Sequence, residues 1–573
     1  MKKSEIKKVT ALLPKHISKE VFFALLCCAI ASLTIIEPIV LSKLIESATN
    51  QFEQIRYIYV VESILIFVTR VGLTYYKQTS LVRYRNRCIL QLSNKMVSHL
   101  LRVKASYYDD WTASYATSRV IDELSNINGI LPRFLFDGIL SAMICIIIFT
   151  LMISQSWIIG LLTMAFVVAD YFVAFRLPLT KIYKQYNETM ANTKSQTNNL
   201  FQGIIQVKMG DSFQKEEGIY DATLKKALNT LSKKTIFSQF QHLTNSVCRQ
   251  FGYLLVIVIS AIQISTERIT LAQFTMLLSL YNLFWNHTIE AENVIPLYKY
   301  GKVTSDRVLE VLEMDIENGI DCVDPHEKIT SVHFKNVSFA YNQDRPILNQ
   351  LTFSAQSGSI VALAGYSGCG KSTALKILLG FIDRDDGDII LNEQKADVST
   401  LVSLRPKIAY IGQHSFLFNR SLRDNLLYYV ADNSTNEQKV LEYIRSFALD
   451  EMVNSLPEGL DYVLGDNSNT ISVGERQRLC IIRELMKEPD ILIMDECTSS
   501  LDPETERKVF HILKKLSNNM VIVQVAHRPS ALSYSDIVFV LENGCVVASG
   551  KHSSLLQTSS FYQTLLATMK NGV

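Results

Sequence analysis

Six stretches of mostly apolar residues fill the first half of this 573-residue chain. A helix needs about 20 such residues to cross the hydrocarbon core of a bilayer. The stretches therefore predict an all-α transmembrane domain of six helices within residues 21–300. They cover residues 21–45, 55–76, 134–153, 157–176, 247–265 and 271–291.

The rest of the chain is less apolar and has the pattern of a soluble α/β domain. We expect a cytoplasmic segment over 1–20, the transmembrane domain over 21–300, a linker over 301–329 and the α/β domain over 330–573. The basic N-terminus is not followed by a small-residue cleavage site, so we expect no signal peptide.

Charge and cysteine usage exclude several classes of protein. The formal net charge is only +2, which gives no support to nucleic-acid binding. The ten cysteines are scattered and have no Cys-x-x-Cys spacing, which argues against a zinc site and a disulfide framework.

The distribution of lysine and arginine predicts the orientation in the membrane. Cations are frequent in the loops 77–133 and 177–246, absent from 46–54 and 154–156, and limited to Arg268 in 266–270. Cytoplasmic loops carry the excess of Lys and Arg. We therefore expect a multi-pass protein of the cell membrane with both termini in the cytoplasm, and the apolar spacing in the two long loops predicts that they are helical.

Ionisable residues inside the predicted spans are candidates for function, because a charge is expensive in a bilayer. They are Glu37, Glu62, Arg70, Asp170 and Glu290. Four are acidic, which would suit a cationic substrate. The alternative is structural: internal pairing of the Glu62–Arg70 type, with the other residues near helix ends.

A glycine-rich loop begins directly after the apolar run Ser359–Ala364, which predicts a buried strand. The loop fits the pattern Gly-x-x-x-x-Gly-Lys-Ser, whose backbone N–H groups close around phosphate oxygens. Lys371 would reach the β- and γ-phosphates, and the Ser372 hydroxyl would bind magnesium. We therefore expect ATP and Mg²⁺ as cofactors. The phosphate-binding candidates are Gly365, Ser367, Gly368, Cys369, Gly370, Lys371, Ser372 and Thr373.

Two more apolar runs each end in a residue suited to nucleotide chemistry. Asp490–Met494 predicts a strand ending at Asp495 and Glu496, where the aspartate could hold the metal and the glutamate could polarise water. Met520–Ala526 predicts a strand that delivers His527 to the same edge, where it could contact the γ-phosphate.

In this order, these residues resemble the ATP-binding cassette family, and the resemblance extends over nearly the whole chain. Ile471–Arg478 is similar to the family's signature motif, whose Ser472 and Gly474 would approach the γ-phosphate of a partner's nucleotide. Gln413 matches the glutamine loop, which senses magnesium and water. Ser499–Asp502, including Asp502, resembles the loop that crosses the dimer interface, and Tyr341 resembles the aromatic residue that stacks on adenine.

The resemblance is closest to exporter-type half transporters, which fuse six spanning helices to one P-loop ATPase domain. Ile411–Asn419 is similar to the exporter form of the glutamine loop. Gly203–Lys208, Tyr107–Asp110 and Arg119–Ile127 resemble the cytoplasmic loops that dock onto the ATPase domains. The resemblance implies a dimer with a second half transporter.

The signature departs from the family pattern at two positions. Val473 replaces a glycine and Glu475 replaces a glutamine, and Gly465–Ser468 is a weakened form of the preceding exporter loop. With these departures, two copies of this chain need not form two equal ATP sites. The partner could be a second copy or a different half transporter.

The resemblance implies an ATP-driven exporter that alternates between inward- and outward-open states. We expect an amphipathic substrate: a small peptide, a drug-like molecule or a lipid. Two alternatives stay open, namely an importer of metal chelates with exporter architecture, and a regulatory membrane protein that uses ATP as a switch.

Overall fold

The computed structural model describes residues 17–49, 53–110, 120–121, 137–176, 179–319, 327–342, 345–413, 415–465, 471–498 and 500–571. The chain divides into two compact units. Unit 1 contains residues 1–100 and 113–313, and unit 2 contains residues 101–112 and 314–573. Most of the predicted loop helix near Arg119–Ile127 lies outside the described residues.

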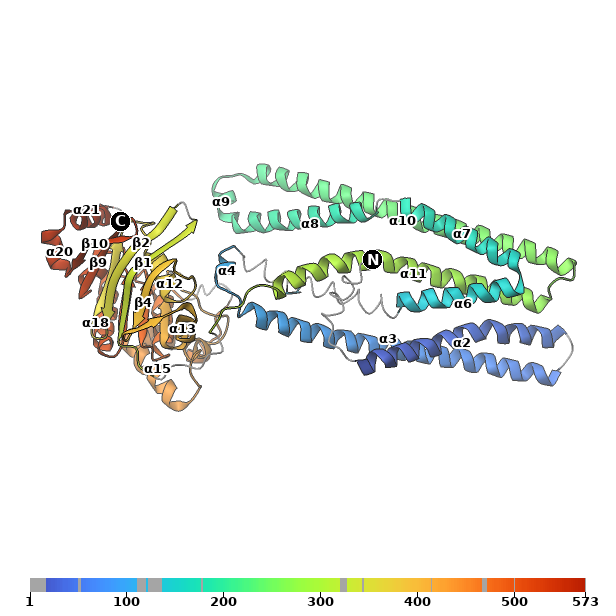
Figure 1. Cartoon of the computed structure of the whole chain (residues 1–573), viewed down its shortest axis with the longest axis horizontal. Helices are drawn as coiled ribbons and strands as arrows, with labels where there is room; N and C mark the ends of the chain where they lie inside the picture. Colours follow the sequence, from blue (N-terminus) through green and yellow to red (C-terminus); the bar gives the residue numbers. More distant parts are fainter. Residues whose placement is uncertain are drawn as a thin grey trace. The chain divides into compact units, whose positions relative to one another are not determined.

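Unit 1 is built from long helices (Figure 1). The helix α11 begins with a capping box, because Thr270 and Gln273 satisfy each other's backbone N–H groups. It continues to Leu312, through the start of the segment where the sequence suggested a linker. The helices are α2 (Ile17–Thr49), α3 (Glu53–Leu100), α6 (Ile139–Gln155), α7 (Trp157–Arg176), α8 (Leu179–Gln202), α9 (Ile204–Met209), α10 (Phe213–Ser265) and α11 (Leu271–Leu312).

Three helices in the described part of the chain are long and apolar enough to cross a membrane. They are at Val21–Ala48, Tyr57–Leu100 and Phe213–Ser265, and two shorter apolar helices lie at Leu140–Gln155 and Trp157–Val173. Each of these five helices overlaps a predicted span, although Tyr57–Leu100 and Phe213–Ser265 are much longer than the spans 55–76 and 247–265. The predicted span 271–291 forms the first half of α11, which carries more polar residues.

The core of unit 1 lies where α11 packs against α6 and its neighbours. Tyr281 and Trp285 of α11 are fully buried, as are Ile148 and Met152 of α6. In water, fully burying such a side chain stabilises a fold by roughly 1.5–3 kcal/mol through the hydrophobic effect. Inside a bilayer this contribution is absent, and close van der Waals packing between helices stabilises the fold instead.

Unit 2 contains two β-sheets. The strand order of the four-stranded antiparallel sheet is β2-β1-β4-β5, and that of the six-stranded sheet is β10-β9-β3-β8-β7-β6. In the larger sheet β9, β3, β8, β7 and β6 are parallel, and only β10 is antiparallel to its neighbour. The strands are β1 (Ser331–Asn342), β2 (Arg345–Gln356), β3 (Ile360–Gly365), β4 (Asp386–Leu391), β5 (Gln394–Ala396), β6 (Ile408–Ile411), β7 (Ile491–Asp495), β8 (Val521–Val525), β9 (Ile537–Glu542) and β10 (Cys545–Gly550).

Helices pack on one face of the larger sheet, and α12 with the smaller sheet packs on the other. The central strands are therefore buried on both sides, which explains why they are apolar runs and not alternating patterns. Alternate residues of β3 belong to separate cores: Ala362 and Ala364 pack into one, Val361 and Leu363 into the other. The helices of unit 2 are α4 (Ser106–Asp110), α12 (Lys371–Leu378), α13 (Val398–Ser403), α14 (Leu422–Leu426), α15 (Ser434–Ser446), α16 (Asp450–Ser455), α17 (Val473–Leu485), α18 (Pro503–Leu516), α19 (Pro529–Ser533), α20 (His552–Thr558) and α21 (Ser560–Asn571).

Candidate nucleotide site

The carboxyl ends of four parallel strands gather the predicted residues at one edge of the larger sheet. β3 leads into the glycine-rich loop, β6 is followed by Gln413, β7 ends at Asp495, and β8 is followed by His527. In open α/β sheets this edge is where ligands bind. The fold therefore brings together four segments that are far apart in the sequence.

The glycine-rich loop has backbone conformations that favour glycine. Gly368 and Gly370 have φ angles of +82° and +102°. At Gly370 a Cβ atom would also lie 2.6 Å from Leu348 Cδ2 and 2.9 Å from the Ile347 carbonyl oxygen. Both the φ angle and the space exclude a larger residue there.

Lys371 folds back over the glycine-rich loop. Its ammonium donates to the carbonyl oxygens of Gly365 and Tyr366, both at 2.9 Å, and lies 3.7 Å from Cys369 Sγ. The side chain is buried, so its charge is held beside the loop by backbone dipoles. Because Lys371 also opens α12, the positive helix end and the ammonium face the same concave loop, which suits an anion.

Asp495 at the end of β7 is linked to the first turn of α12. Its carboxylate has hydrogen bonds with Tyr410 and with Ser372. Burial raises the pKa of Asp495, and the neighbouring Glu496 adds to the increase, whereas Lys371 opposes it. A carboxylate and a hydroxyl held together beside a second carboxylate are a donor set suited to a hard divalent cation.

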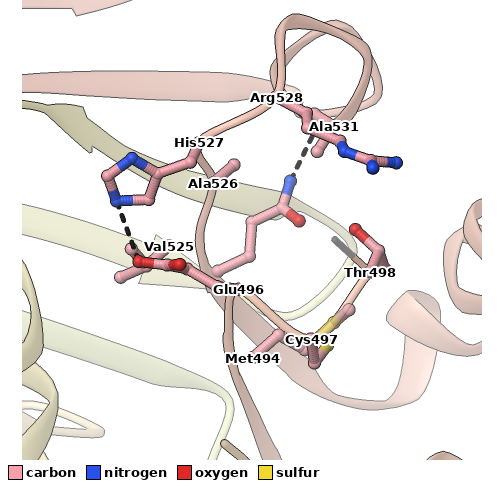
Figure 2. A pocket seen from close by; sticks show the side chains of 10 residues that line it. Met494, Glu496, Cys497, Thr498, Val525, Ala526, His527, Arg528 and Ala531 are labelled. Atoms are coloured by element: carbon pink, nitrogen blue, oxygen red, sulfur yellow. Dashed lines mark hydrogen bonds and ion pairs between the residues drawn. The ribbon is translucent and has the colours of Figure 1, made fainter. Parts of the chain in front are cut away.

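Glu496 lies between His527 and Gln413 (Figure 2 shows the histidine contact). His527 Nε2 is 2.9 Å from Glu496 Oε1, and Gln413 Nε2 donates to Oε2 at 3.2 Å. The backbone of Glu496 is held at φ +54°, and its N–H donates to the Val525 carbonyl of β8. A non-glycine residue in this region of φ is uncommon and is often found at functional sites.

Burial and a nearby cation favour the neutral form of His527. Burial lowers the pKa of His527, and the nearby Lys371 lowers it further, while Glu496 opposes both. The next residue, Arg528, donates to the Leu501 carbonyl at 2.9 Å, which ties the end of β8 to the segment before α18. A small pocket extends from Glu496 and His527 towards Thr498 and Ala531 (Figure 2).

The variant signature forms the N-terminus of α17. Ser472 caps the helix by accepting from the Glu475 N–H, and the Glu475 carboxylate accepts from both the N–H and the hydroxyl of Ser472. Val473, which replaces the family's glycine, is 63% exposed and displaces no neighbour. At Gly474 a Cβ atom would meet Leu501 and Ser500 at ordinary contact distances.

Four of the predicted residues are not brought to the phosphate loop within this chain. Ser472 and Gly474 make no hydrogen bond with the loop among the described residues. Asp502 caps α18 by accepting from the Glu504 and Thr505 N–H groups, and Tyr341 is 53% exposed and contacts Phe339. Ser499 and residues 466–470 lie outside the described residues.

In unit 1, the suggested Glu62–Arg70 pairing is wrong. Arg70 of α3 contacts Glu37 of α2, with 2.9 Å between Nη1 and Oε2, and Glu62 is exposed. The α-helical register explains the difference, because residues eight apart lie on one face too far apart to pair, whereas a neighbouring helix brings Glu37 alongside.

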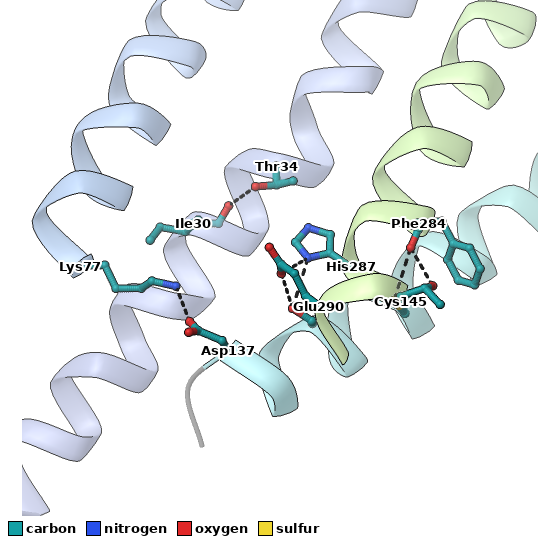
Figure 3. Close-up of polar contacts among 10 residues, drawn as sticks. Ile30, Thr34, Lys77, Asp137, Cys145, Phe284, His287 and Glu290 are labelled. Carbon is teal, nitrogen blue, oxygen red and sulfur yellow. Dashed lines mark hydrogen bonds and ion pairs between the residues drawn. The ribbon is translucent and has the colours of Figure 1, made fainter. Parts of the chain in front are cut away.

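The other ionisable residues of the predicted spans also have partners. Asp170 accepts from the Asn245 amide at 2.8 Å. Glu290 accepts from the Ser141 hydroxyl at 2.7 Å and lies 3.1 Å from His287 Nδ1 (Figure 3). These contacts link α7 with α10 and α6 with α11.

Two contributors to the site were missed from the sequence. Tyr410 of β6 holds Asp495, and burial raises the pKa of Tyr410 to about 12, so its hydroxyl keeps its proton. Its place in a strand just before Gln413 was an available signal. Glu475 was treated only as a departure, although Ser472-x-x-Glu475 is the capping-box pattern.

Two family models match the chain. The model of the ABC transporter transmembrane region matches residues 21–287, and the ABC transporter model matches residues 348–499. Together they contain five of the six predicted spans, most of the sixth (271–291), the glycine-rich loop, Gln413, the signature and Glu496.

Curated relatives match most of the chain at low identity. An uncharacterized ABC transporter ATP-binding protein, YwjA of Bacillus subtilis, is 27% identical over 83% of both chains. An ATP-dependent lipid A-core flippase of Haemophilus influenzae is 26% identical over 85% of this chain and 83% of its own length. The flippase of Vibrio cholerae is also 26% identical, over 83% of this chain and 82% of its own.

The fold matches that of a solved exporter. The structure of a bacterial Atm1-family ABC exporter with ATP bound superposes with a TM-score of 0.83 at 21% identity, covering 96% of this chain and 98% of that chain. The similarity extends over both units. The helical region therefore precedes the α/β domain along the chain, as it does in that exporter.

Proposed function

Because the chain belongs to the ABC transporter family and is a half transporter with the exporter fold, we propose that it uses ATP hydrolysis to move an amphipathic substrate out of the cytoplasm. ATP would bind the closed pair of ATPase domains better than the open pair. Only such a difference in affinity can shift the transporter between inward- and outward-open states.

The observation that carries this proposal is the position of Glu496. Its carboxylate is fixed from two sides by His527 and Gln413, next to the edge where the glycine-rich loop begins. A carboxylate oriented in this way can polarise a water molecule for attack on a phosphate. Glu496 would act as the base, His527 and Gln413 would position it, and Gln413 would also face the metal.

The chain's own residues fit ATP and magnesium. The loop supplies backbone N–H groups, its Gly370 packs too closely against β2 to carry a Cβ atom, and the Lys371 ammonium lies beside the loop. Ser372 and Asp495, already hydrogen-bonded to each other, would hold magnesium, which neutralises phosphate charge when bound. The phosphate contacts would come from Gly365, Ser367, Gly368, Cys369, Gly370, Lys371, Ser372 and Thr373.

A lipid or lipid-like molecule is the substrate class best supported among the amphipathic candidates. Several relatives of similar coverage are named ATP-dependent lipid A-core flippases. Inside unit 1, the polar groups of Ser141, His287 and Glu290 lie together where α6 meets α11, and Figure 3 shows His287 beside Glu290. Such a cluster could contact a polar headgroup, while apolar helix faces contact acyl chains.

The ATP site would be completed by a second half transporter. Ser472 and Gly474 would face the partner's nucleotide, Asp502 would lie at the dimer interface, and Tyr341 would stack on adenine. The partner is a second copy or a different half transporter, and both termini would lie in the cytoplasm of a multi-pass membrane protein.

The proposal is tested with the purified full-length chain in lipid nanodiscs. We expect magnesium-dependent ATP turnover that Glu496→Gln abolishes while a fluorescent ATP analogue still binds. In proteoliposomes, the same chain should accelerate the transfer of a fluorescent lipid between leaflets. Binding without turnover in the wild type would point to a missing partner, and loss of binding itself would contradict the proposed site.

A further inference from the structure

The chain passes from unit 1 to unit 2 at two places that pair with each other inside unit 2. After α3 ends at Leu100, residues 102–104 run antiparallel to residues 315–317, which follow α11. Lys104 N–H donates to the Asp315 carbonyl at 3.1 Å, and Glu317 N–H donates to the Arg102 carbonyl at 2.8 Å. These two segments, 102–104 and 315–317, are called the paired crossings below.

The side chain of Glu317 fixes the paired crossings to the ATPase domain. Its carboxylate accepts from the Ala105 N–H at 3.3 Å and from two nitrogens of Arg405, at 2.5 and 3.0 Å. The Glu317 side chain is only 9% exposed and that of Arg405 is 26% exposed. A bidentate pair that is largely shielded from water is stronger and more strictly oriented than a surface ion pair.

Arg405 connects Glu317 to the end of the phosphate-loop helix. Its Nε donates to the Leu379 carbonyl at 2.9 Å, and Nη2 donates to the Gly380 carbonyl at 3.0 Å. Leu379 is the C-terminal cap of α12, where helix carbonyls have no partner within the helix and the dipole favours a cation. The guanidinium also lies over the Phe381 ring, 4.6 Å from its centroid.

The helix α12 completes the route to the nucleotide site. It begins with Lys371 and Ser372 and has eight residues, so it is a rigid rod of about 12 Å. Two residues after Glu317, Gly319 lies close against α13, because a Cβ atom there would lie 2.3 Å from the Ser399 carbonyl. Glu317 and Arg405 therefore connect the paired crossings directly to the end of the helix that presents Lys371.

We propose that Glu317 and Arg405 couple the paired crossings to the phosphate-loop helix α12, and through that helix to the nucleotide site. When nucleotide fixes the N-terminus of α12, the ion pair restrains the crossings at its other end. The coupling rests on the proposed ATP binding, and it is tested by a measurement that needs no turnover.

The experiment is hydrogen–deuterium exchange of the full-length chain in nanodiscs, with Glu496→Gln in every sample to retain ATP. Adding magnesium and ATP should slow exchange in peptides covering 102–105 and 315–317 by about tenfold, because their amides open less often. Glu317→Gln and Arg405→Lys should each remove this protection. The affinity of each variant for a fluorescent ATP analogue should stay within about twofold of the parent's, because the weakened hydrogen-bonded pair lies away from the phosphates.

Arg423→Gln is the matched control. Arg423 also pairs with carboxylates, those of Glu437, Asp461 and, at 4.0 Å, Asp432, and its side chain is 23% exposed. Among the described residues, it has no hydrogen bond or ion pair with the crossings or α12. It should retain the ATP-dependent protection. Protection that persists in both test variants, or is absent from the parent with ATP bound, overturns the coupling. Loss of ATP binding in the parent would instead contradict the proposed function.

Discussion

The Ser472 hydroxyl donates to the Glu475 carboxylate at 2.6 Å, so the serine of the signature is engaged by a negative charge at the start of α17. A glutamate at this position strengthens the helix through the capping box. It also opposes the approach of an anion to the positive helix end. We therefore expect Glu475 to stabilise the domain and to slow the chemistry at a partner's ATP.

Glu475→Gln should raise ATP turnover of the full-length chain by about tenfold, the effect of removing one unfavourable charge close to phosphate. The measurement is steady-state turnover in nanodiscs at saturating ATP. Glu504→Gln is the control, because Glu504 is also an acidic residue in the first turn of a helix, α18. Equal or lower turnover in Glu475→Gln would show that the carboxylate does not limit the site.

Gly370 and Gly358 permit a comparison between crowding and backbone strain. Both have positive φ angles, +102° and +91°, but a Cβ atom at Gly358 would meet nothing within 4 Å. Gly358→Ala should lower stability by about 1 kcal/mol through strain alone and leave nucleotide binding intact. Gly370→Ala should also displace Leu348 or the loop. Its affinity for a fluorescent ATP analogue should fall at least tenfold, which corresponds to a loss of about 1.4 kcal/mol or more of binding free energy. Similar affinities in the two variants would contradict this account of the loop.

Much of the site could be predicted because each of its segments has a local signal. The apolar runs before Gly365, Asp495 and His527 predict buried strands, and parallel strands bring their carboxyl ends to one edge. The observed strands β3, β7 and β8 each begin one residue later than the predicted runs, and β3 and β7 extend one residue further. Local patterns therefore located the chemistry to within a residue.

Contacts between distant segments could not be predicted in this way. Glu37 pairs with Arg70 across two helices, and Glu317 pairs with Arg405, 88 residues away. The separation of the two residues in each pair corresponds to no helix or strand period. The sequence therefore suggested Glu62, which is nearer along the chain, as the partner of Arg70. The role of Tyr410 depends on the pairing of β6 with β7, which places its hydroxyl beside Asp495. Such contacts follow from strand order and helix packing, which a single sequence does not specify.

Cys369 provides a chemical test of the phosphate loop. Its side chain is 9% exposed, and its sulfur lies 3.7 Å from the Lys371 ammonium, so an added maleimide would occupy the space of the phosphates. Complete modification should abolish turnover, and ATP should slow the modification. Turnover of Cys369→Ser should not respond to the reagent. Full turnover, with mass spectrometry confirming a modified Cys369, would refute the prediction.

The pH dependence of turnover tests the protonation state of His527. Since burial and Lys371 lower its pKa, the folded protein has a neutral imidazole at pH 7 that donates from Nε2 to Glu496. The unfolded chain, with a histidine pKa of 6.5, binds the proton first as the pH falls. The contribution of His527 to stability is therefore present above pH 6.5 and is lost as the pH falls towards the lower folded value.

Turnover should follow the same direction, because a protonated His527 holds the Glu496 carboxylate more tightly and makes it a weaker base. We expect the turnover rate to be constant from about pH 8 to about pH 6.5 and to decline at lower pH. This decline, the acid limb of the pH–rate profile, reflects the pKa of His527, which is lower than the usual histidine value. His527→Gln should turn over at least about 100-fold more slowly and lose this acid limb. His511→Gln, which changes an exposed histidine of α18, should retain both rate and limb. An acid limb above pH 7 in the wild type would contradict a neutral His527, because the imidazole would then gain its proton more readily than a free histidine.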